Sequence, residues 1–197
     1  MATAERLFAE YGVVAVSSRQ ISEAAGQGNN AAVGYHFGTK DELIRAIVRR
    51  HDERIELVRK RMVDRVGAEG TVRAWIECLV LPYTEHLAAA GATSWYARFL
   101  AQVDTDPAQR ELVEAETSGA EQLARIAQAL GPRLDELPPP VCAERIQMVK
   151  SLLLHMCAER ERTLALSEED PGPAWAQTAG MLVDAISGLL FAPVSAA

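Results

Sequence analysis

The chain has 197 residues, 49 % of them hydrophobic and 24 % charged, and its formal net charge is -7 at pH 7. This hydrophobic content excludes a disordered chain, and the length allows one ordinary domain or a small domain followed by a larger one. The charge is uneven, because residues 1–61 hold 10 Lys and Arg against 8 Asp and Glu, whereas residues 62–197 hold 10 against 19. A mildly basic first part before an acidic remainder suits a protein that presents only that first part to a polyanion.

The three cysteines, Cys78, Cys142 and Cys157, are odd in number, widely spaced and without a CxxC motif. This pattern indicates reduced thiols in a cytosolic protein, as small buried side chains or, alternatively, as a redox or metal sensor. The first residues include Glu5 and Arg6 and form no apolar signal segment. No apolar run approaches the roughly 18 residues of a membrane-spanning helix. We therefore expect a soluble, cytoplasmic protein with no membrane partner.

The amino-terminal residues 2–12 are predicted to form the first helix. Leu7, Phe8 and Tyr11 fall on one face at helical spacing, and Gly12 follows directly. A glycine here allows the left-handed backbone with which many helices end.

A helix-turn-helix pattern follows. Ser17 is placed to cap a short second helix, and a glycine-containing turn leads to a third helix from about Asn30 to Phe37. Two short helices joined by such a turn are the sequence form of this motif. The second helix of the motif enters the DNA major groove, while the first braces it across the backbone.

A long helix is predicted next, because Thr39 and Glu42 form a capping-box pattern. Its apolar stripe is expected to consist of Leu43, Ile44, Ile47, Val48, His51, Ile55, Val58 and Met62. Charged residues fill the opposite face, and Gly67 and Gly70 are expected to end the helix.

The rest of the chain predicts further helices and shows no strand pattern and no internal repeat. The expected helices cover residues 71–90, a shorter segment after Ser94, residues 106–130, 141–163 and 173–191. Pro82 is expected to kink the first of these. Gly119 is expected to weaken the third, and Pro138 to Pro140 to form a rigid spacer.

The last two predicted helices, residues 141–163 and 173–191, are apolar on more than one face. Such a helix must be buried on two sides. The second cover is either the rest of this chain or another subunit. We favour an intermolecular four-helix bundle in which two chains each contribute both helices, that is, a homodimer.

Residues 4–48 resemble the DNA-binding head of the tetracycline-repressor-like (TetR/AcrR) transcriptional regulators. The resemblance rests on AERLFAEYG from Ala4, on the segment from Ser17 to Gly26, and on YHFGTKDEL from Tyr35. The last segment is the most specific, with aromatic–His–Phe, a turn, Lys and an acidic pair before Leu. The chain departs from the family pattern in two ways. It has one additional residue between Gly26 and Tyr35, and only three residues precede Ala4, where family members often carry a basic arm.

The resemblance implies an all-α fold with a three-helix head at residues 1–48. A long helix joins this head to a larger helical effector-binding and dimerisation domain at residues 49–197. It also implies that the protein binds a palindromic operator in double-stranded DNA as a homodimer. An unknown small-molecule effector would release the homodimer from this operator. The function is then that of a ligand-responsive repressor. The alternative is a helical ligand-carrier or interaction protein that no longer binds DNA.

Eight residues are candidate DNA contacts, namely Ser17, Arg19, Asn29, Asn30, Gly34, Tyr35, His36 and Lys40. Ser17 and Arg19 open the bracing helix and suit a phosphate, or else act only as a cap and a solvated charge. Asn29 and Asn30 suit adenine edges or a phosphate, or only a turn and a cap.

The other four candidates surround the third helix. Gly34, by resemblance, replaces a larger groove-facing side chain and so reduces base contact. Tyr35 and His36 are expected to donate hydrogen bonds to phosphates in this motif. Lys40 is expected to contact a phosphate from the start of the long helix, its alternative being an exposed charge.

A ligand pocket in the larger domain is expected to be lined by aromatic, sulfur and histidine side chains, namely Trp75, Tyr83, Trp95, Tyr96, Phe99, Met148 and His155. The alternative for each is ordinary core packing. The sequence contains no metal-ligand spacing and no catalytic or phosphate-loop motif. We therefore expect no metal, no cofactor and no enzymatic activity.

Overall fold

The structure is a computed structural model, and it describes residues 1–26, 32–67, 69–117 and 119–194. Throughout these residues the regular elements are helices, as predicted, and none is a strand. The helices are α1 (Ala2–Tyr11), α2 (Ser18–Ala24), α3 (Ala32–Phe37), α4 (Lys40–Val66), α5 (Val72–Ala90), α6 (Tyr96–Asp104), α7 (Pro107–Thr117), α8 (Glu121–Leu134), α9 (Pro139–Leu164) and α10 (Pro171–Phe191).

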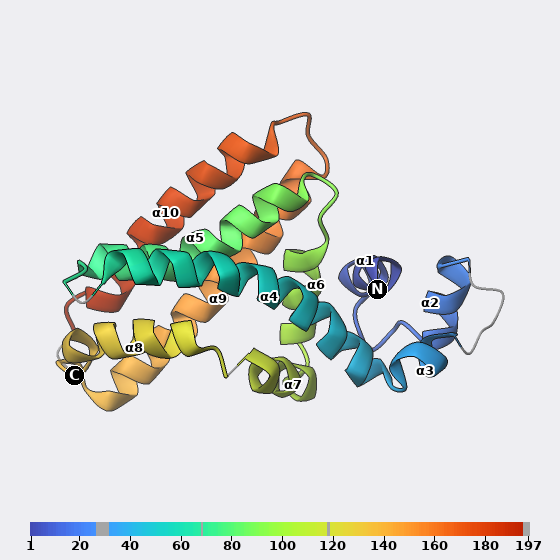
Figure 1. Ribbon diagram of the computed structural model, residues 1–197, viewed down its shortest axis with the longest axis horizontal. Coiled ribbons are helices and arrows are strands. Elements are labelled where there is room, and N and C mark those ends of the chain that lie inside the picture. Colours follow the sequence, from blue (N-terminus) through green and yellow to red (C-terminus); the bar gives the residue numbers. More distant parts are fainter. Residues whose placement is uncertain (27–31, 68, 118, 195–197) are drawn as a thin grey trace.

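The molecule is elongated, with α1 to α3 at one end and the carboxyl terminus near the other (Figure 1). Helix α4 begins beside α3 and extends along the larger helical part, where α5 packs against α4 and α10. The two parts are in contact, because α1 packs against α6. In that contact the Phe8 and Phe99 rings stack with their centroids 6.0 Å apart.

The capping signals of the head have their expected structural effect. Gly12 has a φ of 84° directly after α1, and Gly38 has a φ of 76° between α3 and α4. Both values lie in the left-handed region that favours glycine. The Thr39 hydroxyl accepts a hydrogen bond at 3.1 Å from the backbone N–H of Glu42 and so caps α4.

The buried stripe of α4 differs from the prediction at its carboxyl-terminal end. There Arg59 and Val63 are buried, whereas the predicted Val58 and Met62 are only partly buried. Arg59 is 6 % exposed, and its Nε donates to the carbonyl oxygen of Cys78 at 3.3 Å. A stripe with a period of 3.6 residues shifts by one position over several turns, and here the shift brings a charged side chain against α5.

Two predictions for the middle of the chain are wrong. The single helix over residues 106–130 is two helices, since α7 ends at Thr117 and α8 begins at Glu121 and then continues past Gly131 to Leu134. The proposed proline spacer instead starts α9, with Pro139 and Pro140 in its first turn. Proline is tolerated there because the first helical N–H groups have no partner within the helix.

Helix α10 is long and apolar enough to cross a membrane by length and composition, contrary to the expectation from its sequence. Of its apolar window, 44 % is buried inside the protein. The helix packs against α5 and α9, and Trp175 and Ile186 are fully buried there. Helix α10 is therefore partly buried in the core of the larger helical part.

Candidate nucleic-acid interface

Helices α2 and α3 lie at the end of the molecule that is farthest from the carboxyl terminus (Figure 1). Helix α2 begins with a reciprocal capping box. The Ser17 hydroxyl accepts from the Gln20 backbone N–H at 3.3 Å, and the Gln20 side-chain oxygen accepts from the Ser17 backbone N–H at 2.8 Å. The cap is exposed to solvent, so it both fixes the start of α2 and faces any molecule that approaches this end.

The cations of the head are engaged in local ion pairs. Arg19 Nε lies 2.7 Å from Glu23, Arg6 pairs with Glu10, and Arg45 pairs with Glu42. Exposed pairs of this kind add little to stability, because water and salt screen them. They can therefore be exchanged at low cost for contacts with phosphate groups.

The exposed surface of α3 carries Gly34, Tyr35 and His36. A Cβ atom at Gly34 would meet no other atom within 4 Å, and Tyr35 is 84 % exposed. The Tyr35 and His36 rings meet edge to face, with centroids 5.1 Å apart. Phe37, in contrast, packs against the core and holds the helix in place. Asn29 and Asn30 lie outside the described residues.

Lys40 makes contacts that the sequence did not suggest. Its Nζ donates hydrogen bonds at 2.9 Å to the carbonyl oxygens of both Val13 and Val16. These carbonyls belong to the segment that joins α1 to α2. The ammonium group therefore ties this segment to the start of α4, and at least two of its three donors are used inside the protein.

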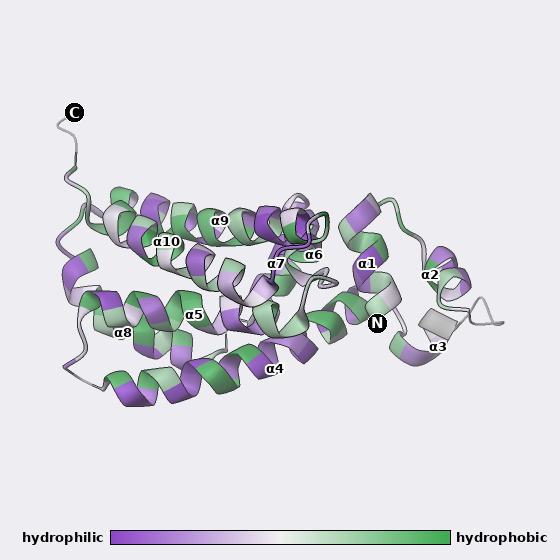
Figure 2. Ribbon diagram, turned by 90° about the horizontal axis from the view of Figure 1, so that it is seen from above, coloured by the Kyte–Doolittle hydropathy of each residue, from purple (hydrophilic) through white to green (hydrophobic). Residues whose placement is uncertain are grey.

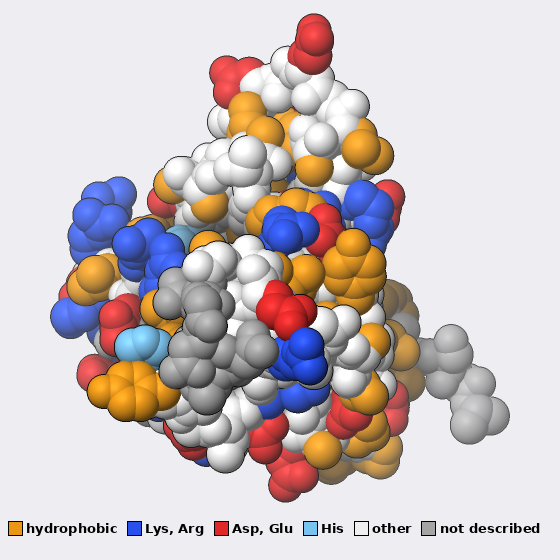
Figure 3. All heavy atoms as spheres, turned by 90° about the vertical axis from the view of Figure 1, so that its right-hand side faces the viewer, with side chains coloured by type: hydrophobic (Ala, Val, Ile, Leu, Met, Phe, Trp, Pro, Cys, Tyr) orange, Lys and Arg blue, Asp and Glu red, His pale blue; other side chains and the backbone are white. Residues whose placement is uncertain are grey.

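Figure 3 faces the end of the molecule that carries the head. Lys and Arg side chains gather toward one edge of this end, with acidic side chains more scattered. Helix α4 contains Arg49, Arg50 and Arg54. Arg49 is held by Glu116 of α7 at 2.8 Å.

Residues 1–47 match the family model described as bacterial regulatory proteins, tetR family. The head is therefore similar to that of tetR-family regulatory proteins. The tetR-family match begins at Met1 and ends within α4, so it covers the helix-turn-helix and the first turns of the long helix. This result confirms the resemblance seen in the sequence.

The tetR-type fold extends over the rest of the chain. The structure is similar to that of a TetR family transcriptional regulator, PfmR, from Thermus thermophilus, with a TM-score of 0.53 and 19 % sequence identity. The similarity covers 94 % of each chain. It confirms an amino-terminal helix-turn-helix head followed by a larger helical domain. No curated protein matches the chain. The head thus matches the tetR-family model, and the fold of the chain is similar to that of a TetR family regulator.

The residues predicted to line a ligand pocket fall into two groups in this tetR-type fold. Tyr83, Tyr96 and Phe99 are buried together, with ring centroids of neighbouring pairs 6.3 and 6.2 Å apart. The Tyr83 hydroxyl is buried and has no hydrogen-bond partner among the described residues. Burial raises the pKa of Tyr83 well above its usual value, so it is a neutral donor.

The other predicted pocket residues lie apart from this cluster. Trp75 is buried near the start of α5, and Trp95 is partly buried, with the Arg98 guanidinium 3.9 Å from its ring centroid. Met148 is 51 % exposed on α9, and the His155 side chain is exposed and 3.8 Å from Asp104. The structure therefore does not bring Met148 and His155 to the buried tyrosines.

A buried network of hydrogen bonds connects the head to the larger domain, and the sequence did not predict it. His51 Nδ1 lies 2.7 Å from His86 Nε2, and His51 Nε2 lies 3.1 Å from a carboxylate oxygen of Glu5. The His51 ring also stacks on Tyr96 at 3.8 Å. The only sequence signal was the position of His51 in the apolar stripe of α4.

Among the residues that the structure describes, no group of His, Cys, Asp and Glu could hold a metal ion.

Proposed function

We propose that this protein is a homodimeric, ligand-responsive transcriptional repressor that binds a palindromic operator through α2 and α3. The observation that carries the proposal is the exposed face of α3, where Tyr35 is 84 % exposed next to Gly34 in a tetR-family head. A large aromatic side chain that is mostly exposed, at the end of a helix-turn-helix, suits a phosphate or base contact in a groove. The protein would act in the cytoplasm.

The proposed DNA contacts divide into three roles. Ser17 and Arg19 would meet the backbone phosphates at the start of α2, while Tyr35 and His36 would donate to phosphates from α3. Gly34 would allow a close approach to the groove. Lys40 would act indirectly, since its hydrogen bonds to Val13 and Val16 set the position of α2 relative to α4.

The dimer is proposed to form through α9 and α10, which lie next to each other along one side of the molecule (Figure 2). Their outer surfaces expose large apolar side chains, with Ile146 41 % exposed, Met148 51 % and Met181 52 %. In the dimer, the same side chains of the partner subunit would bury this second apolar face of the two helices. A two-fold axis there would hold two heads about one duplex turn, roughly 34–36 Å, apart.

The effector is proposed to enter the larger domain next to the buried tyrosines. The Tyr83 hydroxyl has no partner in the described residues, and an unpaired buried hydroxyl costs about 1–3 kcal/mol. A ligand with an acceptor group would remove this cost. Helix α4 belongs to both the head (residues 1–48) and the larger domain (residues 49–197), so a shift of α4 would move the head. The ligand must prefer the state that does not fit the operator, since equal affinity would change nothing.

The test is a duplex selection followed by binding measurements. A random-sequence duplex library is passed over the purified full-length protein, and the enriched duplex is titrated at about 50 and 200 mM salt. We expect a palindromic site whose affinity falls by about a hundredfold between these salt concentrations, as for roughly four neutralised phosphates. Failure to enrich any duplex would favour the alternative, a helical ligand-carrier or interaction protein.

A further inference from the structure

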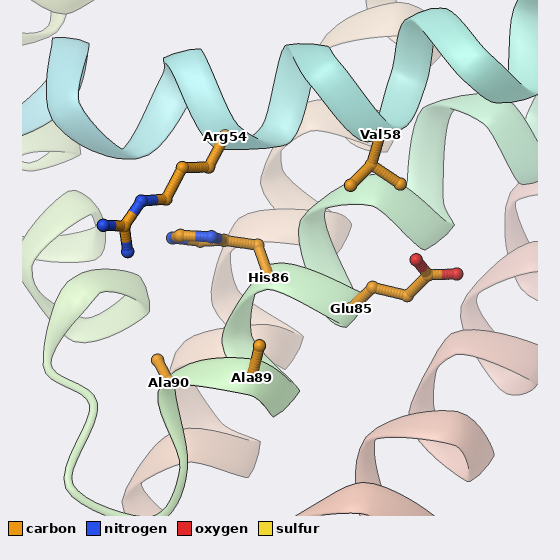
Figure 4. A pocket seen from close by; sticks show the side chains of 6 residues that line it. All are labelled: Arg54, Val58, Glu85, His86, Ala89 and Ala90. Carbon is orange, nitrogen blue, oxygen red and sulfur yellow. The ribbon is translucent and has the colours of Figure 1, made fainter.

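A hollow of about 320 Å³ opens between α4 and α5. Its lining residues are Arg54, Val58, Glu85, His86, Ala89 and Ala90 (Figure 4). The volume lies at the lower end of the range for small-molecule sites. A second surface depression adjoins it and shares Arg54 and Val58, with Lys60 and Arg61 also in its lining.

The hollow carries one cation, Arg54, and one anion, Glu85, which lie apart. The Arg54 side chain reaches from α4 toward the end of the His86 ring, while the Glu85 carboxylate points away from that ring (Figure 4). Arg54 makes no ion pair with any residue that the structure describes, whereas Lys60 of the adjoining depression pairs with Asp64. Val58, Ala89 and Ala90 supply an apolar wall. The pairing of a free guanidinium with an apolar wall suits a carboxylate on a short hydrocarbon group.

His86 connects this hollow to the head by hydrogen bonds. The chain runs from His86 on α5 to His51 on α4, at 2.7 Å, and on to Glu5 on α1, at 3.1 Å. A carboxylate can only accept hydrogen bonds, so His51 donates its Nε2–H to Glu5. With both rings neutral, His51 Nδ1 then accepts from His86 Nε2–H, and the remaining nitrogen of His86 has no hydrogen.

The environment keeps His86 neutral at pH 7. Burial, together with the positive charges of its neighbours, lowers its pKa from 6.5 to about 4. The charged and titratable groups around it are Glu5 on α1, Arg50, His51 and Arg54 on α4, and Tyr96 on α6. An anion beside Arg54 would offset these positive charges and favour protonation of His86, whose new N–H could donate to the anion.

We propose that this hollow binds a small monocarboxylate, held by Arg54 and His86, and that its occupancy is transmitted to the head through His51 and Glu5. The carboxylate pairs with the Arg54 guanidinium, and its hydrocarbon part lies against Val58 and the two alanines. Its arrival reorganises the His86–His51–Glu5 hydrogen bonds and thereby the position of α1. Binding of the carboxylate does not require that the protein binds DNA. The proposed effect of the carboxylate on the head rests on the proposed function.

The binding test uses the purified full-length protein in isothermal titration calorimetry. The probes are straight-chain monocarboxylates from acetate to octanoate, and benzoate, each with its matching alcohol. We expect at least one carboxylate to bind about tenfold or more tightly than its alcohol, and Arg54→Met to remove this preference. Arg65→Met, an exposed change on the same helix outside both lining sets, should have no effect.

Proton uptake gives a second, independent readout. Titrations in buffers of different ionisation enthalpy should show net proton uptake near pH 7 for the wild type, and His86→Gln should abolish it. Three results would overturn the site: no carboxylate binds at millimolar concentration, the alcohols bind as well, or Arg54→Met binds unchanged.

The transmission is tested with the selected operator duplex and the tightest carboxylate. We expect the carboxylate to change the duplex affinity of the wild type by about fivefold or more. Glu5→Gln, and separately His51→Gln, should reduce this change, with circular dichroism confirming that each variant folds. A carboxylate that binds without changing the duplex affinity overturns the transmission. Carboxylate binding without any duplex binding overturns the proposed function and leaves the site standing.

Discussion

Glu161 of α9 accepts two hydrogen bonds from Arg98 of α6, one from its backbone N–H at 2.9 Å and one from its Nε at 3.1 Å. Its other oxygen accepts from the backbone N–H of Ala97 at 3.2 Å. At the start of α6, Trp95 in the N-cap position makes no side-chain capping bond, and the Ser94 hydroxyl accepts from the Tyr96 N–H at 3.5 Å. A carboxylate from a distant helix thus caps the helix that contacts the head.

Replacing this cap is expected to destabilise the protein strongly. Glu161 is 2 % exposed, so Glu161→Ala leaves the Nε–H of Arg98 and two helix N–H groups without their acceptor. We expect the free energy of unfolding in urea to fall by about 3–5 kcal/mol. Glu159→Ala, on the same helix but in an exposed pair with Arg162, should change it by less than about 1 kcal/mol. Equal effects would contradict this role of Glu161.

Lys40 is expected to act on the position of the head and not as a phosphate contact. Lys40→Met removes the hydrogen bonds to Val13 and Val16, so the free energy of unfolding should fall by about 1–3 kcal/mol. Duplex affinity should fall as well, with an unchanged dependence on salt. A phosphate contact would instead reduce the salt slope by about 1 per contact, and that result with unchanged stability would refute the bracing role.

Tyr35 is expected to matter for DNA and not for folding. Its side chain is 84 % exposed, so Tyr35→Ala should shift the unfolding midpoint little. It should still weaken operator binding by about tenfold for each protomer, as one lost phosphate hydrogen bond is worth about 1–2 kcal/mol. Tyr11→Ala is the matched control, because Tyr11 is 65 % exposed at the end of α1. If both variants bound DNA equally well, the assignment of α3 would be wrong.

The proposed dimer interface can be tested by introducing one charged side chain on α10. Met181→Asp places a carboxylate on the apolar surface of α10, and we expect sedimentation at micromolar concentration to shift from dimer to monomer. Leu166→Asp is the control, since Leu166 is 86 % exposed after the end of α9. A dimer that persists in Met181→Asp would exclude this surface as its interface.

His86 is expected to link stability to pH. Its pKa is about 4 in the folded protein, against 6.5 ordinarily, so folding favours the neutral ring. The stability that follows is complete above pH 6.5 and is lost as the pH falls toward 4, by at most about 3 kcal/mol. Urea unfolding from pH 7 to 4 should therefore show a flatter pH dependence in His86→Gln than in the wild type. Parallel curves would contradict the shift.

Local features of the fold followed from the sequence because they depend on neighbouring residues. The cap at Thr39 and the glycines that end α1 and α3 involve positions a few residues apart. The YHFGTKDEL pattern is equally local, and it was sufficient to place the head. The division between α7 and α8 was missed, because one Gly119 weakens a helix without showing whether packing will break it.

What only the tertiary structure decided was the pairing of polar groups that are distant in the sequence. Lys40 with Val13, Glu161 with Arg98, and His51 with Glu5 and His86 are each separated by 27 or more positions. A charged or histidine side chain has the same local pattern whether it faces solvent, a phosphate or a buried carbonyl. Its partner is determined by how the helices pack, so composition and spacing identified the head but could not show how the head is connected to the larger domain.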